Sequence, residues 1–306
     1  MPTLLPEPSA AATQPQRRYL DLYEPLRPDL YRYCRHLVRS PWEAEDLAQD
    51  TMARAFVTLA GLAEAPQNPR AWLFRVASNL WIDRVRHVRE MPGAGELAEP
   101  AEDAEPRAAR EAAGTLMAQL SPQERAAVVL KDVFDLSLDE IAEALSTTTG
   151  AIKAALHRGR GKLVEPTTNA PATVAPAVLD AFCAAFNARD IDRLTSLLLD
   201  ASTVEMPGVA IERGPEAARS GSLYGILFGC SADPEPWAPR RSEVRAYRGE
   251  WILLWWRGDV EVNAVVRVEI AGDRLARIRN YFLAPDVITE VCRELGVPFR
   301  THGYRL

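Results

Sequence analysis

The pattern of apolar and polar positions separates the chain into helical segments first and alternating strands later. Apolar residues recur every three or four positions through residues 18–90 and again through residues 114–165, which indicates amphipathic helices. From residue 177 onward two helical stretches are followed by strands, and residues 260–270 alternate apolar and polar side chains. This order predicts a multidomain protein with two all-α modules and a C-terminal α+β domain.

Segments that lack this periodicity are expected to lie between or outside the folded domains. One is rich in Ala, Glu and Pro and is acidic, and another is rich in Pro and Thr, so both are typical of solvated linkers. The predicted organisation is a polar tail at 1–17, a helical domain at 18–90, an acidic linker at 91–113, a second helical domain at 114–165, a linker at 166–176 and an α+β domain at 177–306.

Composition narrows the class of protein. The chain has 306 residues, 47% of them hydrophobic and 25% charged, with a formal net charge of -6. This balance is typical of a soluble globular protein and argues against one coated in positive charge. It leaves nucleic-acid binding open, because such footprints are local. No run approaches the ~20 apolar residues that a membrane span needs, so no membrane partner is expected.

Four cysteines are scattered along the chain without a C-x-x-C pair, namely Cys34, Cys183, Cys230 and Cys292. A disulfide framework or a zinc site would need closer or paired spacing. We therefore expect four separate buried thiols, no metal, and a reducing, cytoplasmic location.

Serines mark three predicted helix starts. Ser40, Ser121 and Ser137 each begin an S-x-x-E sequence, in which the serine oxygen accepts from the third helical amide and the glutamate returns to the serine amide. These capping boxes are structural signals and assign no function.

The helix expected after Pro41 has two distinct faces. Ala48, Met52 and Ala55 fall on one face, which should pack inward. A different, acidic face holds Asp46, Gln49 and Asp50. Two interpretations are open for that face: favourable charge near a helix N-terminus, or a docking surface for a basic partner.

The helix expected from Asn68 onward is also two-sided. Its inward positions are Leu73, Val76, Ala77 and Leu80, and the opposite stripe consists of Arg75, Ser78, Asn79, Ile82, Arg86 and Arg89. Basic side chains with an amide and the nearby Trp72 and Trp81 could hold a DNA backbone and receive an unstacked base. An ordinary solvated basic face with aromatics in the core explains the pattern equally well.

A stronger pattern lies in the second module. Residues 138–145 and 149–163 read as two helices joined by a tight turn at 146–148, which is the helix-turn-helix arrangement. The outward stripe of the second helix comprises Thr149, Lys153, His157 and Arg160, flanked by Arg158 and Lys162. Such a helix could enter the major groove of DNA, while a basic surface helix in a bundle is the alternative.

Together the two modules resemble the bacterial extracytoplasmic-function sigma factors. Region 2 of that family is similar to residues 44–56 and 68–86, and region 4 is similar to residues 120–163. The resemblance implies that Asp46, Gln49 and Asp50 dock on core RNA polymerase. It further implies that Arg75, Asn79, Ile82 and Arg86 contact the -10 element, and that residues 149–162 read the -35 element. No catalytic residue and no cofactor is expected, because the polymerase performs the chemistry.

The C-terminal domain resembles the SnoaL-like (nuclear-transport-factor-like) cone fold, in which helices precede a curved antiparallel sheet. In some sigma factors such an extension is implied to modulate activity. Four aromatic residues could line a pocket for a small-molecule ligand or could equally be core residues: Tyr224, Trp237, Trp255 and Tyr281. Asp259, Glu261 and His302 are acid–base candidates, but no spacing selects any of them.

These observations support three functional hypotheses. The first is a sigma factor that binds core RNA polymerase and promoter DNA, with a modulating C-terminal domain. The alternative is a ligand-responsive helix-turn-helix regulator with a SnoaL-like sensor domain, which would leave the acidic face around Asp46 without a role. The third is a SnoaL-like enzyme tethered to DNA, although fold analogy alone does not license catalysis.

Overall fold

The computed structural model describes residues 24–38, 40–60, 66–90, 120–161, 175–228 and 241–301. The chain forms two compact units, one within residues 11–170 and one from residue 171 onward, and each is described here by itself. The predicted tail at 1–17 and acidic linker at 91–113 lie outside the described residues, as does most of the linker at 166–176. None of the described helices is long and apolar enough to cross a membrane.

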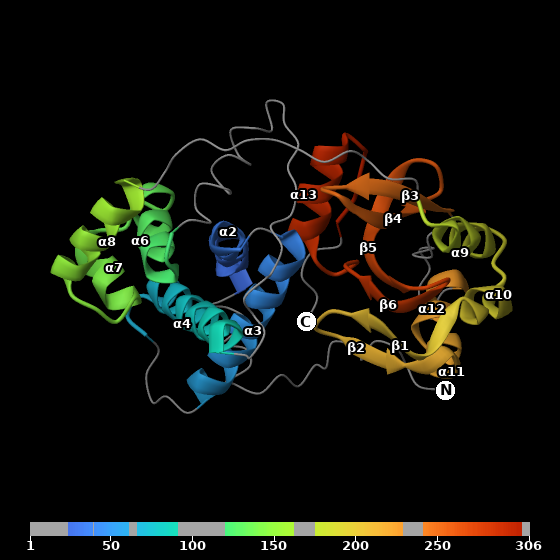
Figure 1. The fold of residues 1–306 in the computed structure, drawn as a ribbon, viewed down its shortest axis with the longest axis horizontal. Helices are drawn as coiled ribbons and strands as arrows, with labels where there is room; N and C mark the ends of the chain where they lie inside the picture. The colour runs from blue at the N-terminus through green and yellow to red at the C-terminus, as the bar shows by residue number, and fades with distance from the viewer. Residues whose placement is uncertain are drawn as a thin grey trace. The chain divides into compact units, whose positions relative to one another are not determined.

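In its described residues the first unit consists of helices and the turns between them (Figure 1). Its elements are η1 (Glu24–Leu26), α2 (Arg27–Leu37), α3 (Pro41–Ala60), α4 (Pro69–Glu90), α6 (Pro122–Asp132), α7 (Leu138–Ala144) and α8 (Thr149–Gly161). Helix α3 packs on α2 and α4, and α8 packs on α6 and α7. Helix α6 also contacts α2 and α4, and α7 contacts α4, so the two predicted modules lie against each other in one unit.

The serines predicted to cap helices do so in three places. Ser121 and Ser137 form complete capping boxes at the starts of α6 and α7. At α3 the oxygen of Ser40 accepts from the amide of Trp42 at 3.3 Å. Each of these bonds satisfies an amide that the helix itself leaves without a partner, so the sequence fixes where these helices begin.

The second unit combines helices with one sheet, as predicted. Its elements are α9 (Ala177–Asn187), α10 (Ile191–Ser196), β1 (Leu198–Met206), β2 (Ala210–Arg213), α11 (Gly214–Ser220), α12 (Ser222–Phe228), β3 (Arg241–Tyr247), β4 (Glu250–Arg257), β5 (Glu261–Ala271), β6 (Arg274–Asn280) and α13 (Pro285–Leu295). The six strands follow the order β2-β1-β6-β5-β4-β3. Every neighbouring pair is antiparallel except β1 and β6, which run parallel. The expectation of a purely antiparallel sheet is therefore wrong for this pair.

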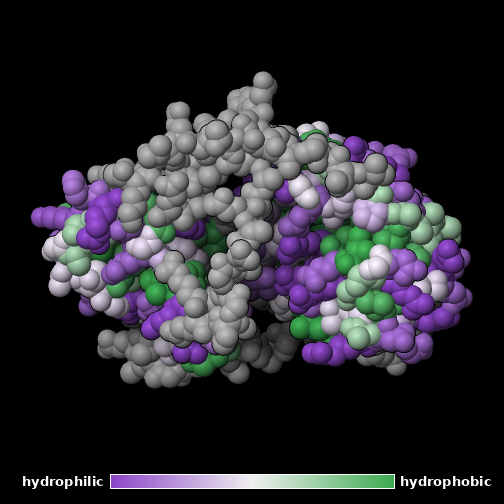
Figure 2. All heavy atoms as spheres, in the orientation of Figure 1, coloured by the Kyte–Doolittle hydropathy of each residue, from purple (hydrophilic) through white to green (hydrophobic). Residues whose placement is uncertain are grey.

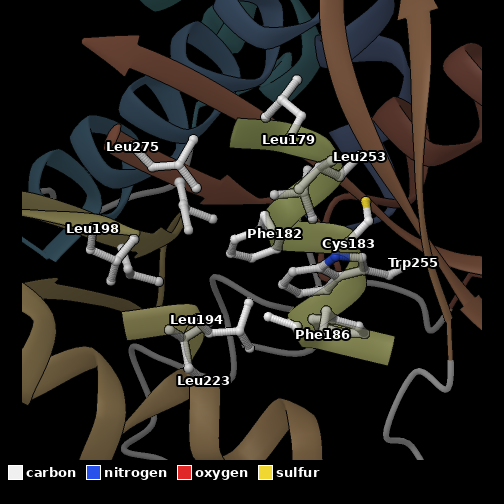
Figure 3. Close-up of a cluster of buried hydrophobic side chains, with 14 of the residues drawn as sticks. Leu179, Phe182, Cys183, Phe186, Leu194, Leu198, Leu223, Leu253, Trp255 and Leu275 are labelled. Atoms are coloured by element: carbon white, nitrogen blue, oxygen red, sulfur yellow. The ribbon is translucent and has the colours of Figure 1, made fainter. Parts of the chain in front are cut away.

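One face of the sheet and the helices α9 to α12 enclose the core of this unit. Figure 3 shows Phe182, Cys183 and Phe186 of α9 pointing toward Leu253 and Trp255 of the sheet. The ring of Phe186 stacks on that of Trp255 with centroids 5.0 Å apart. Burial of such large apolar side chains is the main favourable contribution to folding here.

Helix α13 covers part of the opposite face of the sheet. It contacts β5 and buries Val287, Ile288 and Val291. For that reason Val265, on the face of β5 expected to be polar, is fully buried. Gly296 ends α13 in the left-handed conformation with φ 67°, which glycine adopts without steric cost at the end of a helix.

Several predicted boundaries in this unit are wrong. The apolar spacing from Ile191 onward predicts a helix that continues through Leu198, but Leu198 opens β1 and pairs with Leu275 of β6. Strands β1 and β2 were not predicted. Val260 was expected in a strand, yet it lies in the turn before β5 and is 72% exposed. For Leu198, pairing with a strand far along the chain, which local periodicity does not contain, decides the structure.

Candidate nucleic-acid interface

Helix α8 presents the basic face that the sequence predicted. Ile152 and Leu156 are buried against α6 and α7, and Lys153 and His157 are exposed. Thr149 is half-buried at the first position of the helix. The side chain of Arg160 and the whole of Lys162 lie outside the described residues. In Figure 2 hydrophilic side chains gather at the end of the helical unit where α7 and α8 lie.

Arg158 of α8 has a partner on another helix. Its Nε donates to Oε1 of Glu124 at 3.0 Å. The arginine side chain is 58% exposed, while that of Glu124 is only 5% exposed. The guanidinium therefore joins α8 to the first turn of α6 on a side chain that remains largely at the surface.

Helices α6 and α8 approach each other closely beside this pair. A Cβ added to Gly159 would lie 2.9 Å from Cγ2 of Val128, which is closer than packed carbon atoms allow. Glycine at this position lets the two helices meet.

The turn between α7 and α8 is held by short-range hydrogen bonds. Ser146 adopts a positive φ of 50°, and the amide of Thr147 donates to the carbonyl of Ala142 at 2.9 Å. Oγ1 of Thr148 then accepts from the amide of Ala151 at 3.2 Å and caps α8. The predicted helix-turn-helix is thus present, and its second helix starts at Thr149 as expected.

The predicted stripe on α4 is partly exposed. Asn79 and Arg86 are exposed, and Arg75 and Ile82 are half-buried. Arg86 forms an ion pair with Asp83 on the same helix. Arg89 lies in α4, but the structure does not describe its side chain.

Ser78 does not belong to this stripe, contrary to the prediction. It is fully buried, and its hydroxyl lies 2.7 Å from the hydroxyl of Tyr33 in α2. It also donates to the carbonyl of Phe74 at 2.6 Å. A small hydroxyl side chain fits a helix–helix contact when both of its hydrogen-bonding roles are met, and here α2 supplies the second partner.

The acidic face on α3 is present, but its members are engaged with neighbouring side chains. Asp46 and Gln49 are half-buried, and Asp50 is exposed and paired with Arg84 of α4. Nε2 of Gln49 donates to Oε1 of Glu45 at 2.7 Å.

Glu45 is fully buried beneath this face and forms an ion pair with Arg27 of α2. Removing one partner of a buried pair leaves an uncompensated charge, so the pair holds α3 on α2. The buried ion pair between Glu45 and Arg27 therefore lies directly beneath the acidic face.

An aromatic and arginine cluster joins the two halves of the helical unit. Phe134, in the turn after α6, lies with its ring centroid 5.0 Å from that of Phe74. The guanidinium carbons of Arg32 and Arg70 stand 4.7 and 5.3 Å from the same ring. Nearby, Arg125 of α6 donates to the carbonyl of Leu37 at 2.6 Å. Each cation over an aromatic face adds attraction to the apolar contact.

The aromatic residues proposed to line a C-terminal pocket are not brought together. Trp255 is buried in the core beneath α9, while Tyr224 of α12 is 52% exposed and packs on Phe228. Tyr281 is buried beside Arg279. The side chain of Arg279 lies on the face of β6 opposite to the core that contains Trp255. Trp237 lies outside the described residues. Trp255 is therefore a core aromatic, which was the alternative left open above.

The acid–base candidates likewise form no cluster in the described part of the chain. Asp259 is exposed and paired with Arg241, and Glu261 lies near Arg257 and Arg300 at 3.7 Å each. His302 lies outside the described residues. Within those residues no group of three or more His, Cys, Asp or Glu side chains is placed to hold a metal ion.

Sequence reasoning missed two residues that shape this interface. Glu124 was recognised only as the closing residue of a capping box, and its bond to Arg158 could not be inferred from spacing. Phe134 carried no periodic signal because it lies in a turn. A bulky aromatic in a polar turn is the one available hint of a tertiary contact.

Comparison with known proteins matches the two helical modules. Residues 22–90 match the family model of Sigma-70 region 2, and residues 110–163 match that of Sigma-70, region 4. The chain is 32% identical over 222 residues to the ECF RNA polymerase sigma factor SigG of Mycobacterium tuberculosis strain H37Rv, and the match covers 60% of each protein. This chain therefore spans 60% of the length of that relative.

Two further similarities complete this picture. The RNA polymerase sigma-E factor of Streptomyces coelicolor is 34% identical over 142 residues, which cover 44% of this chain and 78% of that protein. An NTF-2 like protein of unknown function from Burkholderia xenovorans LB400 matches 34% of this chain and 79% of its own, with 20% identity and a TM-score of 0.26. On the two region matches and the extent of the sigma-E match, the chain belongs to the ECF RNA polymerase sigma factors.

Proposed function

We propose that this chain binds core RNA polymerase and directs it to promoters by recognising a -35 and a -10 element, with the C-terminal domain modulating that activity. The observation that carries the proposal is the presence of both regions in order, each with an outward polar helix face. Region 4 offers α8, with Lys153 and His157 exposed, and region 2 offers α4, with Asn79 and Arg86 exposed.

The two DNA-binding faces have distinct tasks in this proposal. Helix α8 enters the major groove, where early side chains reach base edges and later ones reach phosphates. On α4, Asn79 and its basic neighbours hold a base that has left the stack, which offsets part of the unpairing cost and helps the strands separate. The chain supplies binding energy and no chemistry, because the polymerase makes the phosphodiester bonds.

Reading both elements requires the helical unit to open. Elements centred at -35 and -10 lie about 25 base pairs apart, or roughly 85 Å at ~3.4 Å per base pair. In the closed unit α4 contacts α7, which contacts α8, so two interhelical spacings of about 10 Å separate the two faces. We therefore propose that the contacts around Phe134 break when the chain joins polymerase and promoter.

The acidic face of α3 is the proposed polymerase contact. Asp46, Gln49 and Asp50 would meet basic side chains of the polymerase, and Asp50 would exchange Arg84 for one of them. Exchange of one exposed ion pair for another costs little, since exposed pairs contribute at most about 1 kcal/mol. Docking can therefore proceed without unfolding α3.

The decisive experiment is reconstitution with core polymerase. The purified full chain should co-elute with core enzyme and confer initiation at promoters mapped by transcription-start sequencing after overexpression. The double charge reversal Asp46→Lys and Asp50→Lys should abolish co-elution. The matched control is Asp180→Lys, a charge reversal at an exposed position of α9, which should leave co-elution unchanged.

Two results would contradict the proposal. Failure of the unaltered chain to bind core enzyme would reject the sigma function. Normal binding and promoter output by the double charge-reversal variant would instead support a helix-turn-helix regulator that acts without polymerase docking.

A further inference from the structure

We propose that Glu124 is a positioning residue for promoter recognition, which holds the guanidinium of Arg158 in the orientation that contacts the -35 element. This inference rests on the proposed function, because it assumes that α8 reads DNA. It adds a residue outside the recognition helix to the set that determines specificity.

The carboxylate of Glu124 is fixed by two different donors. Its Oε2 accepts from the amide of Ser121 at 3.0 Å, and its Oε1 accepts from Nε of Arg158 at 3.0 Å. The amide of Glu124 in turn donates to Oγ of Ser121 at 3.3 Å, which completes the capping box. With the side chain only 5% exposed, the carboxylate cannot move without breaking the start of α6.

This bond selects one orientation of a flexible side chain. A guanidinium has five N–H donors in a rigid fork, and the Nε–H edge is directed at Glu124. Nη1 and Nη2 form the end of the fork, on a side chain that is 58% exposed. An arginine already held in this way loses less rotamer freedom when it binds a phosphate or a guanine, so its contact is both tighter and more selective.

The backbone beside the pair supports the same conclusion. Gly159 follows Arg158 and lets α8 touch α6 at Val128, with Cβ of Glu124 lying 3.7 Å from the position a Cβ would take. The recognition helix is thus tightly packed on α6 beside the position where the carboxylate bonds Arg158. If α8 were loosely packed on α6, the guanidinium of Arg158 would not be held at a constant distance from Glu124.

The second capping box provides an internal comparison. Oε2 of Glu140 accepts from the amide of Ser137 at 2.8 Å, and the amide of Glu140 donates to the serine oxygen at 3.2 Å. This cap has the same geometry as that of Glu124, but within the described residues its carboxylate bonds no arginine of α8. Glu140 is half-buried whereas Glu124 is buried, so Glu140 controls for the capping bonds, and substitutions at Arg158 are needed to assign the remaining effect to that residue.

The test compares Glu124→Gln with Glu140→Gln in the full chain assembled with core polymerase. Ser121 and Arg158 donate to different oxygens of Glu124, and glutamine replaces one of those oxygens with an NH2 donor. In this geometry Glu124→Gln therefore loses one of the two bonds, whereas Glu140→Gln loses only part of a cap. The probe is a promoter selected from a randomised duplex library by the unaltered holoenzyme, and the reference is the same duplex with its -35 element scrambled. The measured quantity is the ratio of the two affinities.

We expect Glu124→Gln to lower this ratio by about five- to tenfold, the order of one oriented arginine contact, and Glu140→Gln to change it less than about twofold. Affinity for the scrambled duplex should not fall in the Glu124 variant, because a negative charge near DNA has been removed. Arg158→Lys, an exposed substitution that keeps the charge but lacks the Nε–H edge, should reproduce the lowered ratio. That variant tests the proposal even if Glu124→Gln folds poorly.

The final arm places Glu124→Gln in an Arg158→Ala background. If Glu124 acts through Arg158, the second substitution adds less than about twofold to the first. A full additional loss there, or equal ratios for Glu124→Gln and Glu140→Gln, overturns the positioning role while leaving -35 recognition intact. An unaltered holoenzyme that does not distinguish the two duplexes overturns the proposed function itself.

Discussion

The ring of Phe134, in the turn that follows α6, packs edge-on against the ring of Tyr33 in α2, with their centroids 5.9 Å apart. The two residues belong to regions 4 and 2, so this contact crosses the boundary between the modules. Tyr33 is itself fixed by its hydroxyl contact with Ser78 at 2.7 Å. Burial raises the pKa of the Tyr33 hydroxyl, so it stays protonated at any ordinary pH.

Replacing Phe134 with alanine should weaken the closed helical unit. The ring is 8% exposed and lies against two aromatic rings and two guanidinium groups, so its loss should cost about 3 kcal/mol of unfolding free energy. Hydrogen exchange of the full chain should then show faster exchange in α2 and α6. The neighbouring Val133 is 37% exposed, and Val133→Ala should leave the exchange rates nearly unchanged. Equal protection in both variants would mean that Phe134 does not hold the modules together.

Gly159 and Gly150 of α8 should respond to alanine in opposite ways. At position 159 the new methyl group would lie 2.9 Å from Val128, so α8 must shift, at a cost of about 1–3 kcal/mol. At position 150 the nearest atom is Oγ1 of Thr148 at 3.9 Å, so Gly150→Ala should be neutral or stabilise the helix by about 0.5 kcal/mol. Urea unfolding monitored by helical circular dichroism measures both. A tolerated Gly159→Ala would show that α6 and α8 are not closely packed.

Features defined within a few residues were predictable from sequence. The helix-turn-helix appeared because Ser137 caps α7, a turn follows, and the apolar positions Ile152 and Leu156 recur at helical spacing. The outward positions Lys153 and His157 follow from the same periodicity and are exposed. Their contact with DNA stays a prediction.

Features that depend on distant residues could not be predicted. Ser78 looked like part of an exposed stripe, but Tyr33 lies 45 positions away and turns that site into a polar contact inside the bundle. Leu198 continued a helical pattern, but β6 offers it a strand partner far along the chain. Arg158 was correctly placed at the surface, while the carboxylate that orients it comes from 34 residues earlier. Periodicity reports which face is buried and not which partner buries it.

Glu205 of β1 should be essential to the C-terminal unit. Its side chain is 7% exposed and accepts from Nε of Arg277 at 2.8 Å and Nε of Arg279 at 2.9 Å, two residues of the neighbouring strand β6. The hydrogen bond to Glu205 raises the pKa of Arg277, so this guanidinium stays charged. Glu205→Ala removes the shared carboxylate and should cost about 3 kcal/mol.

The control for Glu205 is Glu269, which also pairs with Arg277, at 3.5 Å, but is 51% exposed. Exposed pairs contribute little, so Glu269→Ala should cost less than about 1 kcal/mol. Thermal unfolding of the full chain, with hydrogen exchange in β1 and β6 to assign the transition, separates the two. Similar losses for both variants would show that burial of Glu205 does not matter.

The buried thiols should resist alkylation in the folded protein. Cys34, Cys183 and Cys292 are free and buried, and burial raises the pKa of each, to about 12 for Cys292. Because the thiolate is the reactive form, iodoacetamide at pH 8 should modify these three only after urea unfolding. Peptide mass spectrometry of native and unfolded samples measures the difference. Rapid native labelling of Cys292 would show that α13 detaches from the sheet in solution.

The same thiols should make the protein less stable in alkali. An unfolded cysteine has a pKa near ~8.5, whereas the folded Cys292 thiol has a pKa of about 12, so the folded state retains a proton that the unfolded state releases. The stability contributed by the neutral thiol is complete below about pH 8.5 and declines as the pH rises toward 12. Urea unfolding between pH 8 and 10, with hydrogen exchange in α13 as the readout, should show this decline. Cys292→Ala removes the titrating group, so the slope of unfolding free energy against pH should decrease by the equivalent of up to one proton released on unfolding. The stability of this variant at pH 7 should be lower, because a buried sulfur has been lost. An unchanged slope in this variant would mean that Cys292 is solvated in the folded protein.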